Sequence, residues 1–252
     1  STKYWDILIY NFLHKKNIVI PQKRKSEKSE KFEGAYVKDP QVGMHKWVMS
    51  FDLNSLYPHL IMQYNISPET LVAQDKVKDM TVDKLLNKEV DTSILKGVTI
   101  TPNGALFKTT QRGFLPEIMQ TMYDDRVKYK KLMLQAKQDY ENTKNPKLLK
   151  DIAKYDNIQL AKKISLNSAY GAIGNNWFRY YDLLVAEAIT TSGQLSIRYI
   201  EHSLNRYINK IVGTVGRDYV LASDTDSVYI TFDGLVSRVF KEKQDKGKIV
   251  DF

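Results

Sequence analysis

The sequence predicts an α+β fold, in which a small antiparallel sheet is joined to a long α-helical hairpin. Residues 219–222 and 228–232 are rich in β-branched and aromatic residues and flank a short polar segment, as the two strands of a β-hairpin do. Residues 47–51 have the composition of another strand. A break at Asn145-Pro146 separates two long helix-forming segments, which predicts two antiparallel helices joined by a short loop.

Length and composition narrow the class of protein. The chain has 252 residues, enough for one large domain or two small ones with a buried core. It contains no cysteine, which excludes disulfides, zinc–cysteine sites and cysteine nucleophiles. Lysine and arginine number 38 against 29 Asp and Glu, and the net charge of +9 favours a polyanionic partner.

The sequence gives no sign of a membrane or export signal. No apolar run approaches the roughly 18 to 20 residues of a membrane span. The first residues also lack the pattern of a signal peptide. We therefore expect a cytoplasmic protein that is not secreted and has no membrane partner.

Several segments around these elements are less informative. Apolar residues in helical spacing predict helices over 1–14 and 183–210. Residues 21–31 have no apolar anchor and are typical of a solvated basic loop, with loose contact to nucleic-acid phosphate as the alternative. Residues 75–111 show no clear pattern apart from a turn at 102–104.

Asp52 follows the 47–51 segment, whose composition predicts a buried strand that presents the carboxylate at its carboxyl end. A polar turn and a helix over 59–64 come next, with Pro58 near the first helical turn. An acid at a strand end suits a cation, and the free N–H groups of the following helix suit an anion. The alternative is that Asp52 simply caps the helix.

Asp224 and Asp226 lie in the polar segment of the predicted β-hairpin. They are two residues apart, so in extended backbone both side chains point to one face. Two adjacent carboxylates repel each other unless a proton or a hard cation lies between them, and oxygen ligands suit magnesium or manganese. The alternative is an ordinary hairpin tip, where Asp is common.

The two long helices, over 116–142 and 147–170, each carry polar residues on one face. On the first, two cations are four residues apart and therefore adjacent. On the second, a lysine, an asparagine and a tyrosine follow the same helical spacing and suit a triphosphate, a sugar and a base. A solvated basic face is the alternative for each helix. The residues concerned are Arg126, Lys130, Lys163, Asn167 and Tyr170.

Three motifs together resemble those of family B DNA polymerases. Residues 52–58 (DLNSLYP) resemble the family's D-x-x-S-L-Y-P motif. Residues 163–171 (KISLNSAYG) resemble K-x-x-x-N-S-x-Y-G, and residues 224–227 (DTDS) match the D-T-D-S motif. Residues 65–70 and 177–182 look most similar to the members from T-even-like bacteriophages. The resemblance implies an α+β polymerase palm with an antiparallel sheet and an α-helical hairpin as fingers.

The resemblance implies a metal-dependent reaction. Two magnesium ions, for which manganese may substitute, would be held by Asp52 and Asp224, with the backbone carbonyl of Leu53 as a further ligand. Asp226 would be a third catalytic acid close to the metals. The ions would activate a primer 3′-hydroxyl and neutralise the triphosphate.

The resemblance also implies a nucleotide site on both sides of the metals. Backbone N–H groups would meet the incoming triphosphate, and the ring of Tyr57 would lie beneath its sugar. The fingers would hold the phosphates, and Tyr170 would pack near the nascent base pair. The implied nucleotide-binding residues are Ser55, Leu56, Tyr57, Arg126, Lys130, Lys163, Asn167 and Tyr170.

The resemblance further implies a division of the chain. Residues 1–23 would be a helical remnant of an N-terminal region, 24–112 the first part of the palm, 113–175 the fingers and 176–252 the second part of the palm. Exonuclease acidic motifs and a thumb are not found in the sequence. We expect those portions to act as partners in the same or a second chain, and a sliding clamp to bind only through regions outside this sequence.

The implied function is DNA-directed DNA synthesis from deoxynucleoside triphosphates on primer-template DNA, in the cytoplasm of a bacterial host cell. One rival is a DNA- or nucleotide-binding fragment that is inactive without the exonuclease and thumb domains. Another is a metal-dependent nuclease built on the same carboxylates. The face with Lys163, Asn167 and Tyr170 argues against a nuclease, which needs no triphosphate site.

Overall fold

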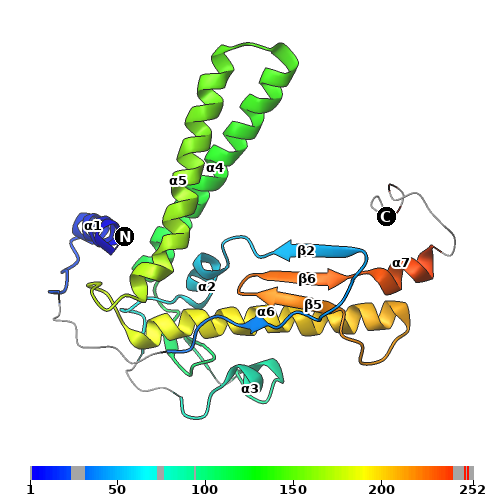
Figure 1. Ribbon diagram of the computed structural model, residues 1–252. Coiled ribbons are helices and arrows are strands. Elements are labelled where there is room, and N and C mark those ends of the chain that lie inside the picture. Colours follow the sequence, from blue (N-terminus) through cyan, green and yellow to red (C-terminus); the bar gives the residue numbers. More distant parts are fainter. Residues whose placement is uncertain are drawn as a thin grey trace.

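An antiparallel sheet lies against one long helix, and a helical hairpin projects away from both in the computed structural model (Figure 1). The structure describes residues 2–23, 32–72, 77–93, 95–240, 247 and 249. The sheet has the strand order β1-β5-β6-β2. Its strands are β1 (Val37–Lys38), β2 (Val48–Asp52), β5 (Val220–Asp224) and β6 (Ser227–Thr231). The predicted α+β class with an antiparallel sheet is confirmed.

Helix α6 (Leu183–Val212) supports the sheet from one side. Asp182 caps its start, accepting hydrogen bonds from the N–H groups of Leu184 and Val185. The core between helix and sheet is apolar because alternate strand residues point toward the helix. Its buried members are Ile197, Ile208, Tyr219, Val220, Val228 and Ile230.

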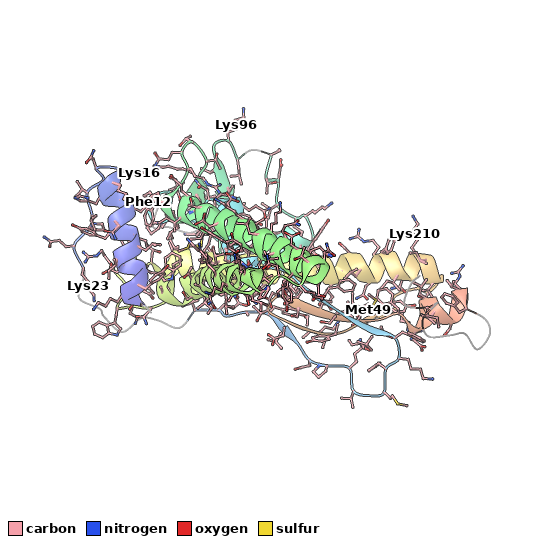
Figure 2. The ribbon with its side chains drawn as sticks, turned by 90° about the horizontal axis from the view of Figure 1, so that it is seen from above. Phe12, Lys16, Lys23, Met49, Lys96 and Lys210 are labelled. Carbon is pink, nitrogen blue, oxygen red and sulfur yellow. The ribbon has the colours of Figure 1, made fainter. Side chains whose placement is uncertain are left out.

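Strand β2 corrects one expectation from the sequence. The 47–51 segment was expected to be a buried strand, but every residue of β2 is exposed, including Phe51 at 47%. The reason is position, because β2 is the last strand of the sheet and α6 covers the inner strands. The side chain of Met49, labelled in Figure 2, belongs to this outer strand. The prediction that Asp52 ends the strand is confirmed.

The hairpin consists of α4 (Phe114–Thr143) and α5 (Lys147–Ile173), close to the predicted bounds. Pro116 lies inside the first turn of α4, where a missing N–H breaks no helical hydrogen bond. An ion pair between Lys162 and Asp125, at 2.8 Å, links the two helices part of the way along the hairpin. Beyond it the helices contact mainly each other, and Figure 1 shows them extending clear of the sheet.

The remaining elements lie around the base of the hairpin and along α6. They are α1 (Thr2–Lys15), α2 (Leu56–Tyr64), α3 (Val82–Leu86), α7 (Asp233–Val239) and a small sheet of β3 (Val98–Ile100) and β4 (Leu106–Lys108). The helices predicted over 1–14, 59–64 and 183–210 are confirmed. The turn at 102–104 joins β3 to β4, whereas α3, β3, β4 and α7 were not predicted. Ser1 and 24–31 lie outside the described residues.

Helix α1 is fixed to the hairpin base through Trp5, whose indole N–H donates to Ser168 Oγ at 3.0 Å. Trp5 and Ile9 belong to the larger of the two cores, which also contains the buried ends of α4 and α5. None of the helices in the described part of the chain has the length and apolar character that a membrane crossing requires.

Candidate active site

The turn between β5 and β6 carries two aspartates in a tight conformation. Thr225, at its centre, has φ +53°, which lies in the left-handed region. The Asp226 N–H donates to the Asp224 carbonyl at 2.6 Å. Asp224 therefore ends β5, while Asp226 lies in the turn itself. The extended backbone that the sequence argument assumed for this pair is not present.

The strand register brings Asp52 to this turn. Asp52 and Asp224 both pair with Ser227, so they lie on the same face of the sheet on either side of β6. Ser227 Oγ donates to Asp52 Oδ2 at 3.3 Å. Two strand spacings separate the backbones of Asp52 and Asp224 by about 10 Å. Asp226 is tied more directly to the end of β2, because its carbonyl accepts the Leu53 N–H at 2.8 Å.

A pocket of about 240 Å³ opens between this acidic edge, the start of α2 and the base of α5. It brings together seven of the predicted site residues, from β2, α2, α5 and the acidic turn. They are Asp52, Ser55, Leu56, Tyr57, Lys163, Asn167 and Asp226, and Asn54, Pro58 and Thr225 complete the lining. Asp224, Leu53, Arg126, Lys130 and Tyr170 do not line it.

The start of α2 presents backbone donors to the pocket. Ser55 has φ +56° and gives no side-chain cap, so the first N–H groups of the helix lack an internal partner. The first α-helical bond runs from the His59 N–H to the Ser55 carbonyl at 3.1 Å. Free N–H groups and the positive end of the helix dipole favour an anion at this position.

The ring of Tyr57 lies between α5 and α6. It meets Tyr170 edge-on, with the ring centroids 4.9 Å apart. Burial, together with the charges of Tyr170, Asp226 and Asp224, raises the pKa of Tyr57 to about 12, so its hydroxyl stays protonated at neutral pH. On the other side the ring approaches Gly193 of α6, where an added Cβ would lie 2.8 Å from Tyr57 Cε1. A larger residue at 193 would therefore displace the ring.

Arg126 holds the backbone turn beside the pocket. Its Nη1 donates to Asn54 Oδ1 at 3.2 Å and to Ser55 Oγ at 3.0 Å. The side chain is buried, and its Nε has no hydrogen-bond partner. Lys130, one helical turn farther along α4, is exposed. The two predicted phosphate ligands thus differ in environment.

The carboxylates repel each other in this arrangement. Burial, followed by the charge of Asp52 and, more weakly, that of Asp224, raises the pKa of Asp226. A cation at the pocket would relieve that repulsion, and magnesium is commonly held by one or two carboxylates with the remaining ligands from water and phosphate. In the part of the chain that the structure describes, no three His, Asp or Glu side chains come close enough to enclose a metal ion. The residues present therefore fit a metal ion that is held jointly by these carboxylates and a phosphorylated ligand.

The sequence analysis missed several residues that shape the site. Asn54 lines the pocket and accepts from Arg126. Gly193 leaves room for the Tyr57 ring, and its occurrence inside a predicted helix was the available signal. The Tyr36 carbonyl accepts the Thr225 N–H at 3.0 Å, and no sequence pattern indicated this contact.

Carboxylates face a lysine and an amide here, beside a free helix N-terminus, and groups of these kinds suit a divalent cation and a phosphate. Comparison with known proteins identifies the family. The sequence profile of DNA polymerase family B matches residues 1–241. The chain belongs to DNA polymerase family B, and the predicted resemblance is confirmed.

Individual relatives show how much of a polymerase this chain resembles. It is 35% identical to the DNA-directed DNA polymerase of Escherichia phage RB69, over 99% of this chain and 32% of that protein. It is 33% identical to the DNA-directed DNA polymerase of Enterobacteria phage T4, over 96% of this chain and 32% of that protein. DNA polymerase 1 of Pyrococcus abyssi is 32% identical, over 88% of this chain and 24% of that protein. The chain thus spans about a third of the length of these phage relatives.

A solved structure shows the same fold. The family B DNA polymerase from Pyrobaculum calidifontis superposes with a TM-score of 0.56 at 24% identity, covering 94% of this chain and 27% of that one. At this identity the likeness concerns the fold alone.

Proposed function

We propose that this chain carries the nucleotidyl-transfer site of a DNA-directed DNA polymerase. The observation that carries the proposal is the meeting of Asp52 and Asp226 with Lys163 and Asn167 in one pocket. These residues come from a sheet and from a helical hairpin that are far apart in sequence. Membership of family B and the names of the phage relatives supply the substrates, which would be primer-template DNA and deoxynucleoside triphosphates.

The acids would hold divalent magnesium, with manganese as a substitute. The pocket favours Asp52 and Asp226 as the ligands, because both line it and Asp224 does not. This reverses the order of importance that the sequence analysis assigned to Asp224 and Asp226. A cation bound there would favour deprotonation of a primer hydroxyl and offset phosphate charge. Two ions remain the proposed number, and the Leu53 carbonyl remains a proposed ligand.

The protein's own groups would position the nucleotide. Lys163 and Asn167 face the pocket from α5, and the backbone N–H groups of Leu56 and Tyr57 face it from α2. A cation and a helix N-terminus on opposite sides would hold a triphosphate between them. Arg126 and Lys130 would join these ligands if the hairpin moved toward the sheet. Arg126 would first have to leave Asn54 and Ser55.

Tyr57 and Tyr170 would shape the sugar and base end of the site. Their edge-on contact and the close approach of Gly193 fix the Tyr57 ring. We propose the division of the chain as before, with 24–112 and 176–252 forming the palm and 113–175 the fingers, after an N-terminal helical region over 1–23.

Primer extension tests the proposal. Wild type and the variants Asp52→Ala, Asp224→Ala and Asp226→Ala would be compared on a short primer-template with magnesium and all four deoxynucleotides. Magnesium-dependent nucleotide binding would be measured on the same samples. Loss of about 10³-fold or more in extension for Asp52→Ala and Asp226→Ala, with a smaller loss for Asp224→Ala, is expected.

Two other outcomes separate the rivals. Nucleotide binding without extension would support a nucleotide-binding protein whose turnover requires other polymerase portions. Folded wild-type protein that neither binds nor extends would contradict the site assignment.

A further inference from the structure

The acidic turn is held in a conformation that its own residues do not favour. Thr225 is β-branched and has φ +53°, which costs free energy unless the surroundings fix it. On one side the Leu53 N–H holds the Asp226 carbonyl. On the other side the Thr225 N–H is held by the Tyr36 carbonyl at 3.0 Å. The turn therefore depends on the segment that contains Tyr36.

That segment includes β1, a strand of only two residues. Val37 pairs with Asp224 and Lys38 with Ser223. So short a ladder supplies few hydrogen bonds, and further bonds come from Gln41, whose N–H and side-chain amide donate to the carbonyls of Leu221 and Val220. Lys38 supplies the charged anchor of β1 among the described residues.

The ammonium group of Lys38 binds two carboxylates on the covered side of the sheet. It contacts Glu201 of α6 and lies 2.6 Å from Asp218, which precedes β5. The Lys38 side chain is 16% exposed and that of Glu201 10%. Lys38 donates to Glu201 Oε1, and Glu201 Oε2 is buried without a hydrogen-bond partner. Such a buried pair is costly to break, because the remaining charge is left unpaired.

Lys38 cannot reach the pocket from this position. Neighbouring strand residues point to opposite faces, so Lys38 points toward α6 when Val37 shares the face of Asp224. It is also absent from the pocket lining. Lys38 therefore makes no direct contact in the pocket, and its link to the acidic turn is the backbone of β1.

We propose that Lys38 is a positioning residue for the acidic turn: by anchoring β1 to Glu201 and Asp218, it keeps the Tyr36 carbonyl where it holds Thr225 and so fixes Asp226 beside Asp52. This inference rests on the proposed function of the acids. It concerns their placement, which can be measured without any turnover.

The experiment compares Lys38→Met with Lys38→Arg and with the control Lys16→Met. Lys16 also forms a lysine–carboxylate pair, with Glu117 at 2.5 Å, but it directly follows α1, away from the sheet (Figure 2). The double variant Lys38→Met/Glu201→Gln removes the unpaired carboxylate and provides a folded sample if Lys38→Met alone unfolds.

Three measurements would be made on each protein. Amide hydrogen exchange at Thr225 reports the bond to Tyr36, with the amides of β6 as an internal reference. Electron paramagnetic resonance would follow manganese binding to the acids. Primer extension would separate kcat from the KM for the nucleotide.

Lys38→Met and the double variant should exchange the Thr225 amide at least about tenfold faster than wild type, with little change in β6. Manganese binding should weaken, and kcat should fall by about 10- to 100-fold, because the displaced acids no longer place the cation correctly. Lys38→Arg should recover most of the manganese binding and of kcat, and Lys16→Met should behave as wild type does.

The inference is overturned if a folded Lys38→Met or double variant keeps wild-type exchange at Thr225, or binds manganese as wild type does. Absence of primer extension by wild type would count against the proposed function alone, because the exchange and manganese measurements would still decide the role of Lys38.

Discussion

The sheet and the helical hairpin contribute to one pocket but are supported in different ways. The strands β5 and β6 rest on α6 with a continuous buried core, so the acids at their end stand on a rigid base. The hairpin is exposed over its outer half, and its last buried residue along α4 is Ala136. In the stretch of the hairpin from 137 to 165 no residue is buried. The site therefore combines fixed carboxylates with cations on an element that has few restraints, as a closing element requires.

After loss of the acids themselves, loss of a hairpin cation should have the largest effect. Lys163→Ala removes a charge from the pocket wall opposite the acids. We expect kcat/KM for the nucleotide to fall by about 100-fold, because the cation would stabilise phosphate charge. Steady-state primer extension measures this. Lys154→Ala, on the exposed outer part of α5, is the control, and an equal loss in both variants would contradict a specific role for Lys163.

Truncation in the two regions should differ strongly in stability. Ile230 is 0% exposed between the sheet and α6, whereas Leu134 on α4 is 51% exposed. Ile230→Ala should lower the free energy of unfolding by about 3 kcal/mol, and Leu134→Ala by under about 1 kcal/mol. Urea unfolding followed by circular dichroism would compare them. Similar losses would mean that the hairpin packs more tightly than its exposure indicates.

Gly193→Ala should separate function from stability. The new Cβ would lie 2.8 Å from Tyr57 Cε1, so the ring must move. Alanine has the higher helix propensity, by about 1 kcal/mol, and this offsets the cost of moving the ring. We therefore expect little change in Tm but a several-fold higher KM for the nucleotide. Gly171→Ala is the control for propensity, since its Cβ would meet nothing within 4 Å. An unchanged KM in Gly193→Ala would show that the Tyr57 ring does not shape the nucleotide site.

The smallest effect should come from Asp218. Burial opposes the charged form, but hydrogen bonds from Lys38 and Asn205 outweigh it and lower the pKa of Asp218. A carboxyl group whose pKa is lowered by folding stabilises the protein at a pH above its pKa in the unfolded chain, which is about 3.9. This stability is lost as the pH falls through the pKa of the folded state. The free energy of unfolding of wild type should therefore be higher than that of Asp218→Asn by no more than about 1 kcal/mol at pH 7. Thermal unfolding at pH 7 and at pH 3 would show the difference shrinking.

Much of the fold could be predicted because periodicity and composition are local. The long helices and the β5–β6 hairpin follow from the residues that form them. The exposure of β2 could not be predicted, because it depends on the place of the strand in the sheet and not on its apolar composition. The elements α3, β3 and β4 are short and are held by contacts with distant segments, such as the bond from Thr99 Oγ1 to the Tyr64 carbonyl.

The site was predicted in its residue types more than in its geometry. Lys163 and Asn167 lie on one helical face, which spacing alone determines. The relative positions of Asp224 and Asp226 depend on the left-handed conformation of Thr225, which no sequence pattern predicts. The environment of Arg126 likewise depends on Asn54 and Ser55, which meet it only in the folded chain.

The edge position of β2 also makes the active site sensitive to folding errors. Side chains alternate along a strand, so a slip of one residue against β6 would turn Asp52 to the opposite face. The exposed side chains of β2 provide little hydrophobic pattern to prevent such a slip. Its ends are fixed by backbone bonds, from the Phe232 N–H to the Trp47 carbonyl at 2.9 Å and from the Leu53 N–H to Asp226. A misregistered chain would keep its helices and its core, and would unfold at a nearly normal temperature, yet the carboxylates of Asp52 and Asp226 would no longer face the same pocket.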